Sequence, residues 1–267
     1  MKPAPFHYAA PDSVPAALDL LADEDARPLA GGQSLIPMLN FRLAQPTLLV
    51  DLNPLGELAG LEVAPDGALR IGAMTRQARL LGSEAVARGW PLLRQAVSHV
   101  GHAAIRSRGT VGGSVAHADP AAELPVALTA LDARFRVRSA ARERGLAAAE
   151  FFRGALTTAL GTGELLVGIE VPRAPAGVRM AFVEHARTHG DFALAGVAAV
   201  CAPGGHAAIA LLGAGPVPVR AAAAERALAG GARAAEVAAL AAAGVEDDYR
   251  RALIAALTQR AVERVVA

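Results

Sequence analysis

The sequence predicts an α+β fold: mixed helices and strands in the first part of the chain, then an antiparallel sheet followed by helices. In the first part, short apolar strand segments alternate with helical ones. Two apolar runs in residues 195–212 flank a Pro-Gly-Gly turn, which is typical of a long hairpin. Beyond Arg220 the pattern is almost wholly helical. The chain has 267 residues, which exceeds the usual size of a single domain. We therefore expect two packed units.

The first unit is expected to span residues 1–172 and to divide into parts of about 1–55 and 56–172, with the second unit over 173–267. The smaller part reads as a strand-turn-helix-strand unit, preceded by a helix that Asp12 and Ser13 cap and that continues to Asp23. Its strands are residues 27–30 and 48–52, and the helix between them, residues 35–40, begins after Ser34.

The larger part begins with a predicted hairpin at residues 61–72, turning at Asp66 and Gly67, and a helical region then continues from Thr75 to about Val100. Asp119 and Pro120 are expected to begin a helix that ends at Leu131. The further predicted strands are 134–138, 164–171, 179–186, 195–201 and 206–212. In the last helix, residues 247–266, the predicted apolar stripe consists of Leu253, Ala256, Leu257 and Val262.

Composition excludes several classes of protein. The formal net charge of +1, with acidic and basic residues interspersed, gives no basic face for nucleic acid. Every stretch of eighteen residues is interrupted by a charged residue, Pro or Gly, so we expect no membrane span. Residues 1–18 lack the continuous apolar core of a signal peptide, so we expect no secretion signal. The single cysteine, Cys201, forms no internal disulfide and cannot build a multi-cysteine metal site. We expect a cytoplasmic location.

Two glycine pairs are the most informative motifs. Gly31 and Gly32 lie in AGGQSL, and Gly112 and Gly113 lie in RGTVGGSVAHADPAAEL. Each pair reads as a turn at the end of a strand, where backbone amides can converge on an anion because no side chain holds the ligand away. Neither segment has the lysine of a nucleoside-triphosphate loop or the spacing of a dinucleotide-binding Rossmann turn. The two turns could therefore hold one diphosphate from opposite sides.

These segments also carry a resemblance. AGGQSLIPMLNFRLAQPTLLVDL and IRSRGTVGGSVAHADPAAELPVALTALDA resemble the two FAD segments of the flavin subunit of molybdenum hydroxylases, the family of carbon monoxide dehydrogenase medium subunits and xanthine dehydrogenase flavin domains. The resemblance covers the whole chain. It implies a p-cresol methylhydroxylase-type FAD-binding fold over residues 1–172 and a C-terminal α+β domain over the rest.

The resemblance also implies which residues bind FAD. The first segment, Ala30 to Ser34, would wrap part of the diphosphate, and the second would hold it from the other side, with His117 and Glu123 close behind. Val100, Leu166 and Phe192 would border the adenine or the isoalloxazine ring, and we expect Phe192 to be the residue that contacts the flavin ring. The implied set is Ala30, Gly31, Gly32, Gln33, Ser34, Leu35, Val100, Ile105, Thr110, Gly112, Gly113, Ser114, His117, Glu123, Leu166 and Phe192.

The function that the resemblance implies is electron transfer. FAD would take electrons from 2Fe-2S clusters on a small partner chain and pass them to an external acceptor, while a large molybdopterin chain performs the substrate chemistry; the family forms a dimer of heterotrimers. We expect no catalytic side chain here. Two alternatives stay open: a self-sufficient FAD-dependent oxidoreductase acting on a small organic substrate, and a cofactor-free assembly protein with the same fold. The substrate and the final acceptor also stay open.

Other clusters point to no chemistry. His99 and His102, and His185 and His189, have spacings found in zinc sites, but neither pair has an evident third ligand, so we expect no metal. Ser114, His117 and Asp119 contain the residue types of a hydrolase triad without a nucleophile-elbow pattern.

Overall fold

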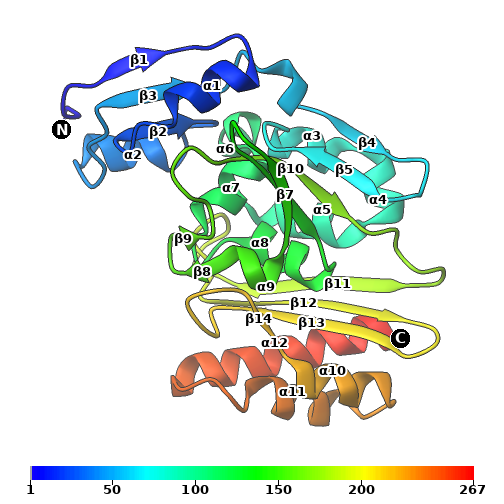
Figure 1. Cartoon of the computed structure of the whole chain (residues 1–267). Coiled ribbons are helices and arrows are strands. Elements are labelled where there is room, and N and C mark those ends of the chain that lie inside the picture. Colours follow the sequence, from blue (N-terminus) through cyan, green and yellow to red (C-terminus); the bar gives the residue numbers. More distant parts are fainter. Residues whose placement is uncertain (1) are drawn as a thin grey trace.

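The computed structural model describes residues 2–267 and places two small mixed layers above a broad antiparallel sheet (Figure 1). The N-terminal sheet has three parallel strands in the order β1-β3-β2, so β3 lies in the centre. Helix α1 connects β1 to β2, and α2 connects β2 to β3, which confirms the predicted strand-turn-helix-strand unit. The bounds are β1 His7–Ala9, α1 Val14–Leu20, β2 Ala26–Leu29, α2 Leu35–Asn40 and β3 Leu48–Asp51.

The second sheet is antiparallel, in the order β4-β5-β10-β6-β7, and β8 pairs with β9 separately. The hairpin predicted at residues 61–72 is confirmed as β4 and β5. Strands β7, β8 and β9 were not predicted, because their sequences carry no apolar alternation strong enough to separate them from loops. The strands are β4 Leu61–Val63, β5 Leu69–Gly72, β6 Arg134–Arg138, β7 Glu143–Ala147, β8 Phe152–Gly154, β9 Thr157–Thr158 and β10 Leu165–Val171.

The helical region predicted after Thr75 is confirmed and consists of three helices. The helix predicted to begin with Asp119 as its N-cap residue and Pro120 in its first turn begins three residues later than expected, at Glu123. The Asp119 carboxylate instead accepts a hydrogen bond from the Ala121 N–H (2.8 Å), which closes a turn before α8. The bounds are η1 Gly56–Leu58, α3 Gln77–Gly82, α4 Glu84–Gly89, α5 Pro91–His99, α6 Ala103–Arg108, α7 Val111–His117, α8 Glu123–Ala130 and α9 Ala148–Phe151.

The third sheet has the order β11-β12-β13-β14 and confirms the long hairpin, since β12 pairs with β13 from Gly196 opposite Leu212 to Ala202 opposite His206. Helix α12 packs on one face of this sheet and α8 on the other, as the lower half of Figure 1 shows. The bounds are β11 Arg179–His185, β12 Ala195–Ala202, β13 His206–Leu212, β14 Val219–Arg220, α10 Ala222–Ala229, α11 Ala234–Ala242 and α12 Asp248–Val266.

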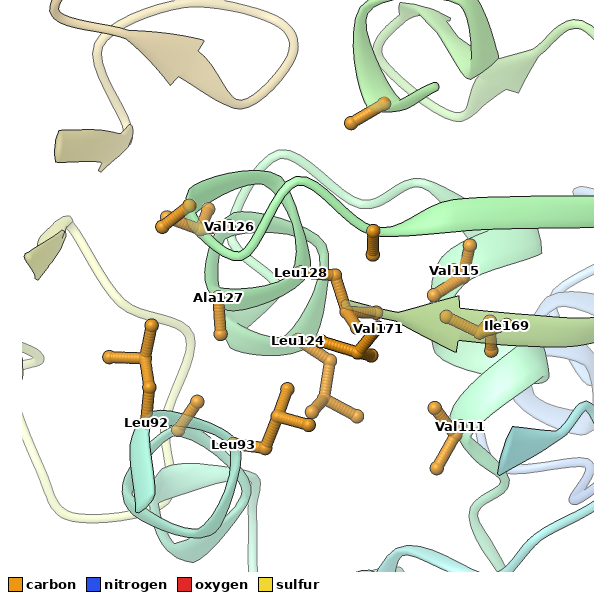
Figure 2. Packing of buried hydrophobic residues seen from close by; sticks show 14 of the residues in the cluster. Leu92, Leu93, Val111, Val115, Leu124, Val126, Ala127, Leu128, Ile169 and Val171 are labelled. Atoms are coloured by element: carbon orange, nitrogen blue, oxygen red, sulfur yellow. The ribbon is translucent and has the colours of Figure 1, made fainter. Parts of the chain in front are cut away.

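Alternation along the third sheet builds two hydrophobic cores. In β12, Ala198 and Val200 face the central core together with the helices of residues 77–130, whereas Val197 and Ala199 face the core under α10–α12. A third core lies beneath α1 and β3. Figure 2 shows the central core where Leu93 of α5, Leu124 of α8 and Val171 of β10 lie close together. The central core thus fixes α5 and α8, which both reach the candidate site.

The buried face of α12 is rotated from the predicted stripe. Its buried residues are Ile254, Leu257, Thr258, Ala261, Val262 and Val265, while Ala256 is exposed. Leu257 and Val262 were predicted correctly. Counting Leu253 instead of Ile254 placed the centre of the stripe one residue too early, because both are apolar and helical spacing fits either.

Across residues 2–267, none of the helices combines the length and the apolarity that crossing a bilayer would require.

Candidate functional site

One cavity, of about 340 Å³, lies where the first glycine segment meets α6, α7 and the start of α8. It brings together segments that are far apart in the sequence. Eleven of the sixteen predicted site residues line it: Gly31, Gln33, Ser34, Val100, Ile105, Thr110, Gly113, Ser114, His117, Glu123 and Phe192.

The remaining five lie nearby or in the protein interior. Ala30, Gly32 and Leu35 belong to the first segment but not to the cavity wall, and the Ala30 carbonyl accepts a hydrogen bond from the Asn53 side chain (3.1 Å). Gly112 packs inside α7. Leu166 is 3% exposed in β10, opposite Val137, and belongs to the central core. The structure therefore does not bring Leu166 to the cavity.

The first glycine segment offers free donors. Within the described chain, 2–267, the backbone N–H groups of Gly31, Gly32, Gln33 and Ser34 have no hydrogen-bond partner, and the Ser34 hydroxyl does not cap α2 although Ser34 is its N-cap residue. Gly32 has φ +73°, a left-handed conformation that favours glycine. The turn thus presents consecutive amides in the way that anion-binding backbone does.

The second glycine pair is not a turn, which corrects the prediction. Gly112 and Gly113 lie inside helix α7, which follows α6 rather than a strand. The Gly112 N–H donates to the Ala73 carbonyl (2.8 Å), and the Gly113 N–H donates to the Thr110 hydroxyl oxygen (3.0 Å), which caps the helix. These amides are therefore occupied, and the polar groups that this segment can offer a ligand are the Thr110 and Ser114 hydroxyls.

Glycine is required here for close packing instead. A Cβ atom on Gly112 would come within 2.5 Å of the Ala73 Cβ, and one on Gly113 would come within 2.6 Å of the Thr110 hydroxyl oxygen. Across the cavity, a Cβ atom on Gly31 would meet the Arg108 carbonyl oxygen, with the Gly109 Cα at 2.8 Å. The two cavity walls therefore touch at Gly31 through bare backbone, and a side chain there would separate them.

A polar network holds these two walls together outside the cavity. The Arg76 guanidinium donates to the Arg108 carbonyl and to the Asn53 side-chain oxygen (2.6 Å), and Asn53 in turn donates to Ala30. Asp51, which follows on β3, accepts a hydrogen bond from the Tyr8 hydroxyl (2.5 Å). This bond helps to hold the pKa of Asp51 below its usual range, although burial opposes the shift.

At the far wall, Glu123 is 7% exposed. Burial raises the pKa of Glu123 to about 8, and the charge of Glu184 adds to the shift while that of His99 opposes it. Next to this wall, His99 Nδ1 lies 3.2 Å from Glu184 Oε1, and this hydrogen bond raises the pKa of His99 although desolvation opposes it. The wall therefore presents a neutral carboxylic acid at neutral pH.

The sequence reasoning missed Gln77, at the start of α3. Gln77 lines the cavity, is 4% exposed, and its side-chain oxygen is buried without a hydrogen-bond partner in the described chain. Its backbone N–H donates to the Gly109 carbonyl (2.9 Å), so Gln77 sits against the second segment. An unpartnered buried amide facing a cavity indicates a ligand contact. Its sequence signal is one polar residue among others at the start of a helix, between Arg76 and Arg79, which is too common to single out.

Phe192 lies at the mouth of the cavity and is 76% exposed. Phe192 is therefore not part of the hydrophobic core beside the hairpin. The loop that carries it also contributes Gly190 and Asp191 to the lining.

The histidines gather near this loop. The His189 ring lies 6.5 Å from the rings of both His99 and His102. In the part of the chain that the structure describes, residues 2–267, there is no group of three or more His, Cys, Asp or Glu side chains placed to hold a metal ion.

Comparison with known proteins gives consistent matches. Residues 4–174 match the family described as the FAD binding domain in molybdopterin dehydrogenase. Subunit alpha of the 6-hydroxypseudooxynicotine dehydrogenase complex of Paenarthrobacter nicotinovorans is 46% identical over 202 residues, which are 75% of this chain and 68% of that protein. The carbon monoxide dehydrogenase medium chain of Afipia carboxidovorans is 40% identical over 75% of this chain and 70% of its own length.

The likeness extends to the complete fold. A structure of carbon monoxide dehydrogenase from Hydrogenophaga pseudoflava, lacking the Mo-pyranopterin moiety of its molybdenum cofactor, superposes with a TM-score of 0.94 at 37% identity, covering 100% of this chain and 99% of that one.

Proposed function

The chain belongs to the family of the FAD binding domain in molybdopterin dehydrogenase, and from this premise we propose that it is the electron-transfer subunit of a multi-chain molybdenum hydroxylase. The cofactor is FAD. The observation that carries the proposal is the cavity between the Gly31 segment and α7, where free amides and hydroxyls converge beside a contact that tolerates no side chain.

The residues present fit this cofactor. The unpartnered amides of residues 31–34 and the hydroxyls of Ser34, Thr110 and Ser114 would bind the diphosphate, because they are donors and FAD carries its negative charge there. The Gln77 amide would bind a hydroxyl or ring group of the same molecule. Phe192 would cover an aromatic ring at the mouth. When bound, FAD supplies redox chemistry, accepting electrons and releasing them singly or in pairs.

The roles of the partners are those that the family resemblance implies. On that basis we place the iron–sulfur clusters on a small partner chain and the molybdopterin on a large one, assembled as a dimer of heterotrimers in the cytoplasm. The cysteine content agrees with the first of these placements, because the single Cys201 cannot ligate a 2Fe-2S cluster, which needs four protein ligands. In this arrangement residues 1–172 form the FAD-binding domain, with parts of about 1–55 and 56–172, and residues 173–267 form the second domain. The chain's own task is to bind and orient FAD.

The test compares the isolated FAD-loaded chain with the complex co-purified with its partners. Candidate substrates drawn from the relatives' chemistry, such as carbon monoxide and N-heterocycles, are added anaerobically while the visible absorbance of the flavin is followed. We expect a substrate to bleach the flavin in the complex and to leave the isolated chain unchanged. Bleaching of the isolated chain would instead identify a self-sufficient flavin enzyme.

Phe192→Ala is expected to weaken FAD binding by about threefold to tenfold, the contribution of one aromatic contact, while leaving the thermal midpoint unchanged because the ring is exposed. Titration of the flavin-free chain with FAD measures this. Phe41→Ala is the matched control, since Phe41 is 63% exposed but does not line the cavity. Equal affinities of the two variants would remove Phe192 from the binding site.

A further inference from the structure

The lining of the FAD cavity contains no permanent cation. Among residues 2–267, which the structure describes, no Arg or Lys side chain lines the cavity, and its only basic side chain is His117. Its acidic side chains are Asp119, Glu123 and Asp191. The diphosphate of FAD is an anion, and free amides and hydroxyls offer it partial charges only. Holding an anion in such a cavity is costly unless positive charge lies close behind the wall.

The guanidinium of Arg76 lies one layer behind this wall. Its Nη1 donates a hydrogen bond to the Arg108 carbonyl oxygen, and the same oxygen is the atom that a Cβ on Gly31 would overlap. Gly31 lines the cavity, and its N–H has no hydrogen-bond partner in the described chain. A single carbonyl group therefore separates the Arg76 guanidinium from backbone that would contact the diphosphate.

The backbone of Arg76 is fixed to the opposite wall. Arg76 pairs with Thr110 in an antiparallel bridge, and the N–H of the next residue, Gln77, donates to the Gly109 carbonyl (2.9 Å). Gly109 and Thr110 both line the cavity. The backbone of Arg76 is thus held at one wall while its guanidinium reaches the other.

The surroundings of Arg76 leave its positive charge largely uncompensated. The guanidinium donates to the Asn53 side-chain oxygen (2.6 Å), which is neutral, and within the part of the chain that the structure describes Arg76 forms no salt bridge. Burial and the charge of Arg108 lower the pKa of Arg76, and the charge of Asp51 opposes this shift. Two guanidinium groups therefore act beside one carboxylate, and both stay charged at neutral pH.

We propose that Arg76 supplies the counter-charge of the FAD diphosphate, acting through the cavity wall and not by direct contact. The inference rests on the proposed function, because its ligand is FAD. Arg76 is a positioning residue: its charge favours the diphosphate at the free amides of residues 31–34. An arginine suits this role because it bonds to neutral oxygens and keeps its charge.

FAD affinity as a function of ionic strength tests the proposal with the full chain, freed of flavin and titrated with FAD. Arg76→Gln is expected to bind FAD about tenfold more weakly than the wild type at about 0.01 M salt, where charges are barely screened. The difference should shrink to about twofold at about 1 M salt, where the screening length is about 3 Å. Arg76→Lys keeps the charge without the forked hydrogen bonds, so it should stay within about threefold of the wild type and retain its salt dependence.

Arg79→Gln is the matched control. Arg79 lies on α3, directly after Arg76, and its Nη1 also donates to a backbone carbonyl, that of Ala59 (2.6 Å). Neither Arg79 nor Ala59 lines the cavity. The control removes the same charge and should bind FAD as the wild type does. An equal loss in Arg79→Gln would show that only net charge matters, and would overturn the inference.

Two further results would overturn the inference while FAD binding itself stands. One is wild-type affinity in Arg76→Gln. The other is an equal loss in Arg76→Gln and Arg76→Lys that persists at about 1 M salt, because Arg76 would then only hold the walls together by hydrogen bonds. Absence of FAD binding by the wild type at every salt concentration would defeat the proposed function, and the inference with it.

Should Arg76→Gln fail to fold, Arg76→His decides. Its FAD affinity relative to that of the wild type should fall as the pH rises through about 6.5, where an imidazole loses its charge. A ratio that does not change with pH would contradict the proposal.

Discussion

Gly31→Ala is expected to weaken FAD binding by about tenfold or more. The added Cβ would overlap the Arg108 carbonyl oxygen and lie 2.8 Å from the Gly109 Cα, both backbone atoms that cannot rotate away. The two cavity walls must therefore separate. Overpacking of this kind costs about 1–3 kcal/mol. The flavin-free chain can relax by widening the cavity, so the cost falls on the complex with FAD. A cost of about 1.4 kcal/mol corresponds to a tenfold loss in affinity.

Titration of the flavin-free variant with FAD measures the loss. Gly82→Ala is the matched control: Gly82 ends α3 close in sequence to Gln77, and an added Cβ there meets nothing within 4 Å. The control should bind FAD as the wild type does. Wild-type affinity in Gly31→Ala would mean that contact between the walls does not shape the binding site.

Glu123→Gln is expected to remove a destabilisation of about 3 kcal/mol that the wild type acquires between about pH 4.5 and pH 7. Burial raises the pKa of Glu123 from 4.5 to about 8, so the unfolded chain releases this proton at lower pH than the folded chain. The stabilisation that the neutral acid provides is complete below 4.5 and is lost progressively as the pH rises toward 8. Glutamine does not titrate and shows no such loss.

Denaturant unfolding of the flavin-free wild type and variant at both pH values gives the comparison. His99 also binds its proton more tightly in the folded chain, and in both proteins its contribution to stability is lost as the pH rises above its unfolded pKa of 6.5. Because this contribution is common to the wild type and the variant, the difference between their free energies of unfolding isolates Glu123. Parallel pH dependences of wild type and variant would show that Glu123 is already ionised in the folded chain.

Local patterns predicted much of the fold. The hairpins at residues 61–72 and 195–212 were recognisable because apolar alternation on both sides of a glycine turn has few other solutions. The buried face of α12 was not recognisable from the sequence, since Leu253 and Ile254 satisfy helical spacing equally. Only packing against the sheet determines which of the two is buried. Strand β7 was missed because Glu143–Ala147 gains its strand conformation by pairing with β6, a tertiary effect.

The site was predicted in outline from two glycine pairs, each expected to form a turn with free amides, and this expectation was right for the first pair and wrong for the second. Gly31 and Gly32 do form a turn with free amides. Gly112 and Gly113 look the same in the sequence but lie in a helix, where glycine permits close packing against Ala73 and Thr110. A glycine pair indicates that another group approaches the backbone closely. Whether that group is a ligand or another part of the protein depends on the neighbours in the folded structure. Gln77 and the His99–Glu184 pair were invisible for the same reason, because their partners come from other elements.

The most direct measurement of the central claim is a titration of the purified, flavin-free chain with FAD, followed by denaturation of the saturated protein and identification of the released compound. The proposed function predicts saturation at one FAD per chain and release of intact FAD. A chain that stays colourless across the titration, while its circular dichroism shows a folded protein, would contradict it.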